Sequence, residues 1–271
     1  GFKGRTLNLM GKHGSTVLGT DNIMMAATLA KGVTVIEGAA AEPEVEDLAN
    51  FLIKMGAKIE GAGTHRITIE GVAELHGAEH TVIPDRIEAG TFLAAGAMIG
   101  EGVTLKRVIP EHLRAVTDSL AECGFKMEST KDSLTIYPNP DARGFNLTTL
   151  PYPGFPTDMQ AQFCALACVI PDTSMITETI FPQRFMHIAE MKRMGAQMTL
   201  QGATAQIRGG HPLKAAPVMA SDLRASAALV LAGLVAEGDT EIHRLYHIDR
   251  GYEHLDDKFA ALGAKLERAK E

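Results

Sequence analysis

The sequence predicts an α/β protein in which one βαβαββ unit recurs, with helices inside each domain and sheets outside. The first observation is a short segment of similar residues around Gly56, Gly124, Gly195 and Gly263, spaced 68, 71 and 68 residues apart. The second is a turn that ends in Thr or Ser and precedes each segment, as in Lys31-Gly32-Val33-Thr34. Two independent markers with one period indicate internal repeats of about 70 residues.

The first copy shows the order of elements within a unit. The run 33–37 is rich in β-branched residues and predicts a strand. The run 45–55 carries apolar residues at helical spacing, and Gly56 ends it because glycine enters the left-handed region freely. The complete expectation is a strand at 5–10, a helix at 22–30, a strand at 33–37, a helix at 45–55 and strands at 58–60 and 66–70.

The first helix of each later unit is apolar on all sides. These helices are expected at 91–99, 163–170 and 225–236. A helix that is apolar all round is normally buried all round. The second helices are amphipathic and should lie nearer the surface, which places the apolar helices against one another behind outer sheets.

The length of 271 residues allows one large or two modest domains. The repeats refine this to a single unit at 1–72, the last of an amino-terminal domain, and a carboxyl-terminal domain at 73–271. That domain would contain units at 73–139, 140–211 and 212–271.

The composition excludes several classes of protein. A hydrophobic fraction of 45% and a charged fraction of 22% are typical of a globular chain. We expect a cytoplasmic protein, since there is no apolar run of membrane-spanning length, no basic, apolar-cored leader and only three cysteines. A net charge of −7 argues against non-specific nucleic-acid binding but leaves room for a basic pocket that binds a small anion.

Familiar cofactor and metal motifs are missing from the sequence. No P-loop or GxGxxG opens a helix, and the ten histidines show no HExxH spacing. Cys164 and Cys168 lie four apart in an apolar helix and are expected to be core residues. We expect no metal and no cofactor.

The starts of the apolar helices carry the most informative residues. Asp85 precedes Glu88 by three and Thr157 precedes Gln160 by three, which is the capping-box spacing. Asp158 and Asp222 could cap helices in the same way. The alternative is an anion site, because helix N-termini attract negative charge. Arg86, Arg184, Arg224 and Arg250 all stand near expected helix starts, where a cation without an anionic partner is unfavourable, and their forked guanidinium groups suit carboxylate or phosphate.

Six motifs along the chain resemble those of the UDP-N-acetylglucosamine enolpyruvyl transferase (1-carboxyvinyltransferase) family. They are Ala41-Glu42-Pro43-Glu44, Pro84-Asp85-Arg86-Ile87-Glu88-Ala89-Gly90-Thr91-Phe92, Phe155-Pro156-Thr157-Asp158-Met159-Gln160-Ala161-Gln162, Arg184-Phe185-Met186-His187, Asp222-Leu223-Arg224-Ala225-Ser226 and Tyr246-His247-Ile248-Asp249-Arg250-Gly251-Tyr252-Glu253. The resemblance implies two inside-out α/β domains of three units each, with ligands between them. It also implies enolpyruvyl transfer from phosphoenolpyruvate to the 3-hydroxyl of UDP-N-acetylglucosamine in peptidoglycan synthesis, with release of phosphate.

The resemblance assigns roles to particular residues. Asp158 matches the aspartate that contacts the sugar hydroxyl and is the candidate general base. Arg224 and Arg250 match the arginines that hold phosphoenolpyruvate, and Arg184 matches a further arginine of the cleft. The remaining matches line the nucleotide-sugar site or its surroundings: Arg86, Glu42, Glu44, Thr157, Ile180, Phe181, Asp222, Leu223, Thr16 and Val17.

The chain also departs from this family. The family has about six units, and the stretch with its catalytic cysteine, the candidate general acid, has no match among Cys123, Cys164 and Cys168. We therefore expect a missing amino-terminal segment of the same protein to be a partner of this chain. Phosphoenolpyruvate and UDP-N-acetylglucosamine are the expected small-molecule partners, with no nucleic acid and no membrane. The alternatives are a transferase acting on shikimate 3-phosphate and a non-catalytic module that binds nucleotide sugars.

Overall fold

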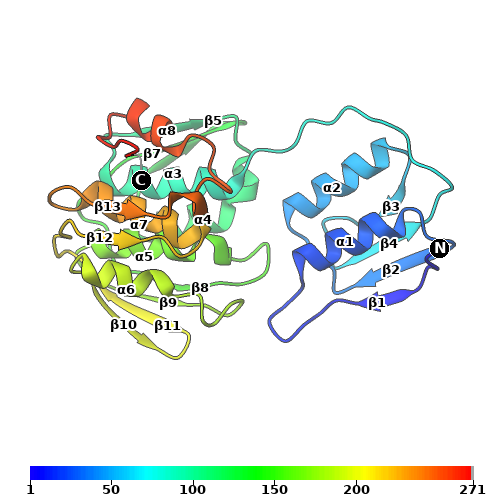
Figure 1. Ribbon diagram of the computed structural model, residues 1–271, viewed down its shortest axis with the longest axis horizontal. Helices are drawn as coiled ribbons and strands as arrows, with labels where there is room; N and C mark the ends of the chain where they lie inside the picture. Colours follow the sequence, from blue (N-terminus) through cyan, green and yellow to red (C-terminus); the bar gives the residue numbers. More distant parts are fainter. Residues whose placement is uncertain (270–271) are drawn as a thin grey trace. The chain divides into compact units, whose positions relative to one another are not determined.

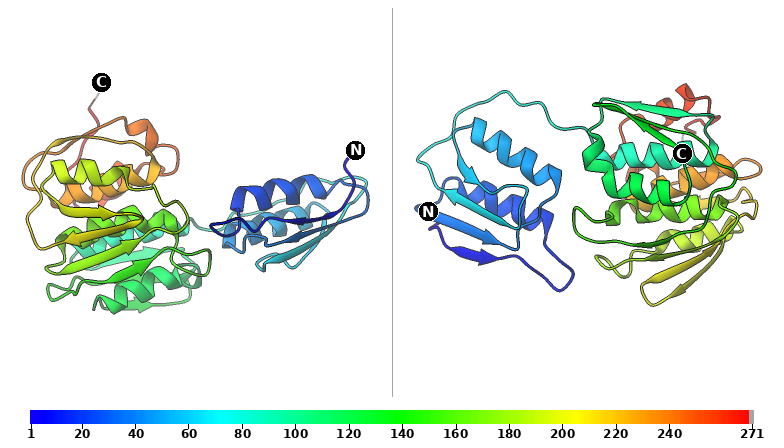
Figure 2. Two further views of the ribbon diagram at one scale, coloured as in Figure 1. Left: turned by 90° about the horizontal axis from the view of Figure 1, so that it is seen from below. Right: turned by 180° about the vertical axis from the view of Figure 1, so that it is seen from behind.

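The computed structural model describes residues 1–269 and divides them into two compact units (Figures 1 and 2). The first comprises residues 1–84 together with 150–156, and the second comprises 85–149 and the chain from Thr157 onward. Within residues 1–269, no helix combines the length and hydropathy needed to cross a membrane.

The first unit contains one complete βαβαββ repeat. In order, it consists of β1 (Thr6–Asn8), α1 (Val17–Ala27), β2 (Val33–Glu37), α2 (Pro43–Lys54), β3 (Lys58–Glu60) and β4 (Arg66–Glu70). The strands form a sheet of order β1-β2-β4-β3, in which β1 and β2 are parallel and the other pairs antiparallel. The bounds predicted for β2, β3 and β4 are confirmed.

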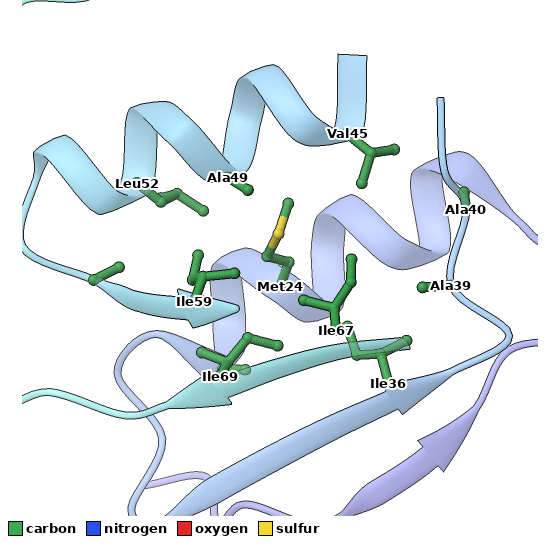
Figure 3. Packing of buried hydrophobic residues seen from close by; sticks show 12 residues of the cluster. Met24, Ile36, Ala39, Ala40, Val45, Ala49, Leu52, Ile59, Ile67 and Ile69 are labelled. Atoms are coloured by element: carbon green, nitrogen blue, oxygen red, sulfur yellow. The ribbon is translucent and has the colours of Figure 1, made fainter. Parts of the chain in front are cut away.

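Both helices of the first unit cover one face of its sheet (Figure 3). Alternate residues of the central strands, Ile36, Ile67 and Ile69, point toward the helices and are fully buried. Met24 of α1 and Ala49 of α2 pack on them from above. Apolar residues that recur every second position along the strands thus pack against apolar residues that recur at helical spacing on α1 and α2.

Three apolar helices form the centre of the second unit. They are α3 (Arg86–Ile99), α5 (Gln160–Val169) and α7 (Leu223–Val235), and they pack against one another. Small residues allow close approach: a Cβ added at Gly90 of α3 would lie 2.8 Å from the Met159 sulfur. The prediction that apolar helices pack inside is confirmed, as is the α/β class, and Cys164 and Cys168 are core residues of α5.

Sheets and amphipathic helices surround these three helices. The sheets have the orders β5-β7-β6, β10-β11-β9-β8 and β12-β13. Residues of β9 and β11 alternate between buried and more exposed, so one face of their sheet packs inward. The strands are β5 (Val103–Lys106), β6 (Met127–Ser129), β7 (Ser133–Ile136), β8 (Asn146–Thr148), β9 (Thr173–Thr177), β10 (Gln197–Gln201), β11 (Thr204–Arg208), β12 (Pro217–Met219) and β13 (Glu241–His243). The remaining helices are α4 (Arg114–Glu122), α6 (Met186–Arg193), α8 (Leu255–Ala261) and the 3₁₀ turns η1 (Pro110–Leu113), η2 (Thr157–Met159) and η3 (Leu245–His247).

Two of the four repeats differ from the expected βαβαββ order. Residues 73–84 form no strand ahead of α3, because this stretch is attached to α2 of the first unit. The His76 amide donates to the Met55 carbonyl at 2.9 Å, and His80 Nε2 lies 2.9 Å from an Asp47 oxygen. Residues 264–269 form no strand after α8, and Arg268 there pairs with Asp249 and Asp256. The division at 72/73 and the bounds of the three later units remain predictions.

Candidate active site

Asp158 lies between two guanidinium groups in the second unit. It belongs to η2, the turn that leads into α5. Arg184 Nη1 is 2.7 Å from one carboxylate oxygen and Arg224 Nη2 is 3.3 Å from the other. The Asp158 side chain is 38% exposed, whereas that of Arg224 is only 13% exposed. One carboxylate therefore holds two cations in a half-buried setting, where charge interactions are stronger than in water.

The pair of arginines controls the ionisation of Asp158. Burial opposes ionisation of the carboxyl, but the charges of Arg224 and Arg184 and their hydrogen bonds outweigh burial and lower the pKa of Asp158. For Arg224, burial alone would favour the neutral form, yet the Asp158 carboxylate raises the pKa of the guanidinium. With Asp158 ionised, the cluster of Asp158, Arg184 and Arg224 carries a net positive charge, because two cations face one anion.

A buried hydroxyl network holds Arg224. Its Nη1 donates to the Tyr252 hydroxyl at 3.4 Å, and the guanidinium lies 5.8 Å from the centre of the Tyr252 ring. The same hydroxyl is 2.8 Å from Thr91 Oγ1 of α3 and accepts from Gln162 Nε2 of α5 at 3.3 Å. Arg224 itself is in the first turn of α7. The arginine is thus fixed by groups on all three central helices.

Arg184 is held by Thr157 of η2 and by Phe181 in the segment after β9. Its Nη1 donates to Thr157 Oγ1 at 3.1 Å, and its guanidinium carbon lies 5.5 Å from the centre of the Phe181 ring. The backbone N–H groups of Ile180 and Phe181 donate to the Glu178 carboxylate at 2.8 and 2.9 Å. Ile180 and Phe181, which were expected to line the site, therefore lie in a segment anchored beside it.

The capping hypothesis holds for two residues and fails for two. Asp85 accepts from the amides of Ile87 and Glu88 and caps α3. Asp222 accepts from the amides of Arg224 and Ala225 at 2.9 Å and caps α7. Thr157 and Asp158 direct their side chains to Glu178 and the two arginines, as described above. Leu223 begins α7 immediately after its cap.

Arg250 is the clearest departure from the predicted cluster. The sequence places it at the start of a helix, but α8 begins only at Leu255, after His254 with a left-handed backbone (φ 48°). Arg250 is exposed in the turn between η3 and α8. Arg86 is the first residue of α3. Out of the expected set, the structure therefore brings together Asp158, Arg184 and Arg224, with Thr157 and Phe181 in contact with Arg184.

Four expected residues belong to the first unit. Thr16 accepts from the Gly19 amide at 3.2 Å and caps α1, which Val17 begins. Glu42 precedes α2 and Glu44 lies in its first turn. Burial and the neighbouring charges of Glu44 and Glu42 raise the pKa of Asp21. Their roles at a shared site with Asp158 remain predictions.

Sequence reasoning missed Glu178 and the residues around Tyr252. Glu178 stands outside every motif, and a glutamate after a strand is an ordinary surface pattern. Tyr252, Thr91 and Gln162 stand inside the motifs, but nothing local shows that three distant segments meet. A polar residue within an apolar helix, such as Gln162, is the one available signal, since buried polar groups need partners. Among residues 1–269 no group of three His, Cys, Asp or Glu side chains could hold a metal ion.

Comparison with known proteins shows which family the chain belongs to. The sequence profile of EPSP synthase (3-phosphoshikimate 1-carboxyvinyltransferase) matches residues 1–259. The chain belongs to the EPSP synthase family. The likeness covers both compact units, so the pairing of Asp158 with two arginines occurs on a scaffold that this family shares.

Relatives within this family are similar over nearly the whole chain. The chain is 62% identical over 270 residues to UDP-N-acetylglucosamine 1-carboxyvinyltransferase of Akkermansia muciniphila, and 58% identical over 267 residues to that of Methylacidiphilum infernorum. It spans 64% and 63% of the length of these relatives, matching their carboxyl-terminal part.

Two solved structures show the same fold. The enolpyruvyl transferase NikO from Streptomyces tendae superposes with a TM-score of 0.88 at 24% identity, covering 96% of this chain and 64% of that one. EPSP synthase from Acinetobacter baumannii superposes with a TM-score of 0.75 at 18% identity, covering 99% of this chain and 64% of that one.

Proposed function

We propose that the protein carrying this chain transfers enolpyruvyl from phosphoenolpyruvate to the 3-hydroxyl of UDP-N-acetylglucosamine, in cytoplasmic peptidoglycan synthesis. The observation that carries the proposal is the Asp158 carboxylate paired with Arg184 and Arg224. The relatives that carry this activity in their names are 62% and 58% identical to this chain. Because the chain spans less than two thirds of their length, the activity is proposed for the longer protein.

Asp158 is proposed as the base for the sugar hydroxyl. Its pKa is lowered, so it is ionised at neutral pH and can accept a proton. In the net reaction the hydroxyl oxygen bonds to C2 of phosphoenolpyruvate and the bond from C2 to the phosphate oxygen breaks. The hydroxyl proton leaves with the released phosphate, so atoms and charge balance.

The two arginines are proposed to bind the anionic groups of phosphoenolpyruvate. Guanidinium groups match carboxylate and phosphate oxygens in geometry as well as charge. Without substrate both arginines bind Asp158. Substrate anions that recruit them would release the Asp158 carboxylate and raise its basicity when the hydroxyl must be deprotonated.

The proposal is tested in a chimera that joins the amino-terminal part of the Akkermansia muciniphila relative to this chain, called here the extended protein. Phosphate release from phosphoenolpyruvate plus UDP-N-acetylglucosamine is the assay. Asp158→Asn should abolish turnover while both ligands still bind, and Asp118→Asn on the exposed face of α4 should leave turnover unchanged. Turnover that survives Asp158→Asn contradicts the assigned base. An unaltered extended protein that binds the ligands without turnover favours the non-catalytic alternative.

A second acceptor is favoured by one observation. The matching family profile is described as 3-phosphoshikimate 1-carboxyvinyltransferase. The same assay with shikimate 3-phosphate in place of the nucleotide sugar separates the two. Phosphate release with shikimate 3-phosphate alone would replace the proposed acceptor.

A further inference from the structure

Glu178 is a fully buried carboxylate one residue beyond the end of β9. One oxygen accepts from Thr149 Oγ1 at 2.8 Å and from the amides of Ile180 and Phe181 at 2.8 and 2.9 Å. The other accepts from Thr157 Oγ1 at 2.9 Å. A buried carboxylate is costly unless its oxygens are hydrogen-bonded, and here both are.

The second oxygen gives a direction to the hydrogen bonds of Thr157. Arg184 Nη1 can only donate to the Thr157 oxygen, so the Thr157 proton points to Glu178. The Thr157 oxygen then offers its lone pairs, and Arg184 Nη1 donates to it at 3.1 Å. The same Nη1 is 2.7 Å from the Asp158 carboxylate. A continuous chain of hydrogen bonds therefore runs from Glu178 through Thr157 and Arg184 to Asp158.

We propose that Glu178 is a positioning residue, which holds Arg184 against Asp158 by fixing Thr157 as an acceptor. Its effect on catalysis rests on the proposed function. The other reading is that Glu178 only anchors the turn at 178–181 through its first oxygen. The two readings differ in which oxygen matters, because only the second oxygen connects to Arg184.

Matched variants separate the two oxygens. Glu178→Gln keeps an amide oxygen that can serve Thr149, Ile180 and Phe181, but it presents an NH₂ group to Thr157. Thr157→Val removes the hydroxyl at nearly constant volume, and Thr157→Ser restores it. Thr149→Val is the control, because it removes one bond to the first oxygen of Glu178 and leaves the second oxygen bonded to Thr157.

The first measurement needs no substrate. Nitrogen-15 NMR of arginine-labelled chain reports rotation of the Arg184 guanidinium, with its signals assigned by their loss in Arg184→Lys. Restricted rotation is expected in the unaltered chain, in Thr149→Val and in Thr157→Ser, and averaged signals in Thr157→Val and Glu178→Gln. Unchanged Arg184 signals in Thr157→Val overturn the proposal even where Glu178→Gln does not fold.

The second measurement is steady-state kinetics of the extended protein. Glu178→Gln and Thr157→Val should each lower kcat by about tenfold to a hundredfold, with a smaller change in KM, because misplaced groups mainly lose rate. The double variant should be no worse than the more damaged single variant. Independent, multiplying losses overturn the proposal. If the unaltered extended protein shows no turnover, the proposed function fails, and the Arg184 signals still decide the role of Glu178.

Discussion

At the residue scale, the ionisation of Asp158 depends on two cations that oppose its burial. Arg224→Gln removes one of them, so burial should then dominate and the pKa of Asp158 should rise. Because the folded pKa is lowered, the pairing stabilises the fold above the ordinary carboxyl pKa, and this contribution is lost as pH falls through the lowered value. Carbon-13 NMR titration of the Asp158 carboxyl measures the midpoint. Arg193→Gln, which alters an exposed arginine of α6 beside Glu190, is the control. An unmoved midpoint in Arg224→Gln contradicts this account.

A second residue-scale prediction concerns His187, which is buried at the start of α6. Burial, aided by the charge of Arg184 and opposed by Asp222, lowers the pKa of His187 to about 4. The imidazole is therefore neutral in the fold, whereas the unfolded chain binds a proton near pH 6.5. This group stabilises the fold above pH 6.5, and the contribution, about 3 kcal/mol, is lost as pH falls from 6.5 to 4. Urea unfolding at pH 7.5 and 4.5 measures the difference. His187→Gln should reduce the pH dependence, while exposed His211→Gln should retain it; equal behaviour of the two variants contradicts the prediction.

The sequence could predict some of these residues and not others. Asp158, Arg184 and Arg224 lie in motifs that resemble a known family, and the structure brings them together. Glu178 escaped because its importance arises from contacts with residues 21 and 29 positions earlier in the chain, which no local pattern reports. Arg250 was placed at a helix start, but the left-handed His254 delays α8.

At the scale of elements, hydrophobic periodicity predicted the strands whose bounds depend on packing within their own repeat. The strands β2, β3 and β4 have the predicted bounds, since alternation of buried and exposed residues fixes them. The absent strand before α3 could not be predicted, because it depends on His76 and His80 binding to α2, which belongs to the preceding repeat. The same limit applies to the contact that joins the three central helices, which depends on Tyr252, more than 80 residues from α5 in sequence.

Tyr252→Phe tests that contact between elements. Its hydroxyl meets Thr91 of α3, Gln162 of α5 and Arg224 of α7, and all but the arginine are fully or nearly fully buried. Removing the hydroxyl deletes its hydrogen bonds to these three groups, although Thr91 and Gln162 still bond to each other, so the free energy of unfolding should fall by about 1 kcal/mol. Thermal or urea unfolding measures the loss. Tyr246→Phe, at an exposed tyrosine of η3, is the control and should change the free energy of unfolding by at most about 0.5 kcal/mol. Equal effects of the two variants would show that the network contributes nothing.

At the scale of the whole molecule, α1 differs from the three apolar helices of the second unit. Those helices bury one another, whereas the first unit exposes an apolar stripe of Leu18 and Met25 on α1 and Leu29 just beyond its end. A helix apolar on several sides is normally covered on those sides. The chain also spans 60–64% of the length of relatives named as 1-carboxyvinyltransferases, and none of its three cysteines matches the catalytic cysteine motif that the resemblance implies.

These two observations predict that the 271-residue chain alone releases no phosphate from phosphoenolpyruvate plus UDP-N-acetylglucosamine. Adding the separate amino-terminal segment of the Akkermansia muciniphila relative should restore release, because that segment would cover α1 and supply the general acid. Leu29→Lys places a charge in the stripe and should weaken the restoration at least tenfold, since covering an unpaired charge is unfavourable. Lys54→Glu, at the end of α2 and outside the stripe, is the control, because it changes the net charge by more than Leu29→Lys does. Robust turnover by the chain alone would sink the prediction, and full restoration with Leu29→Lys would show that the stripe is not where the segment binds.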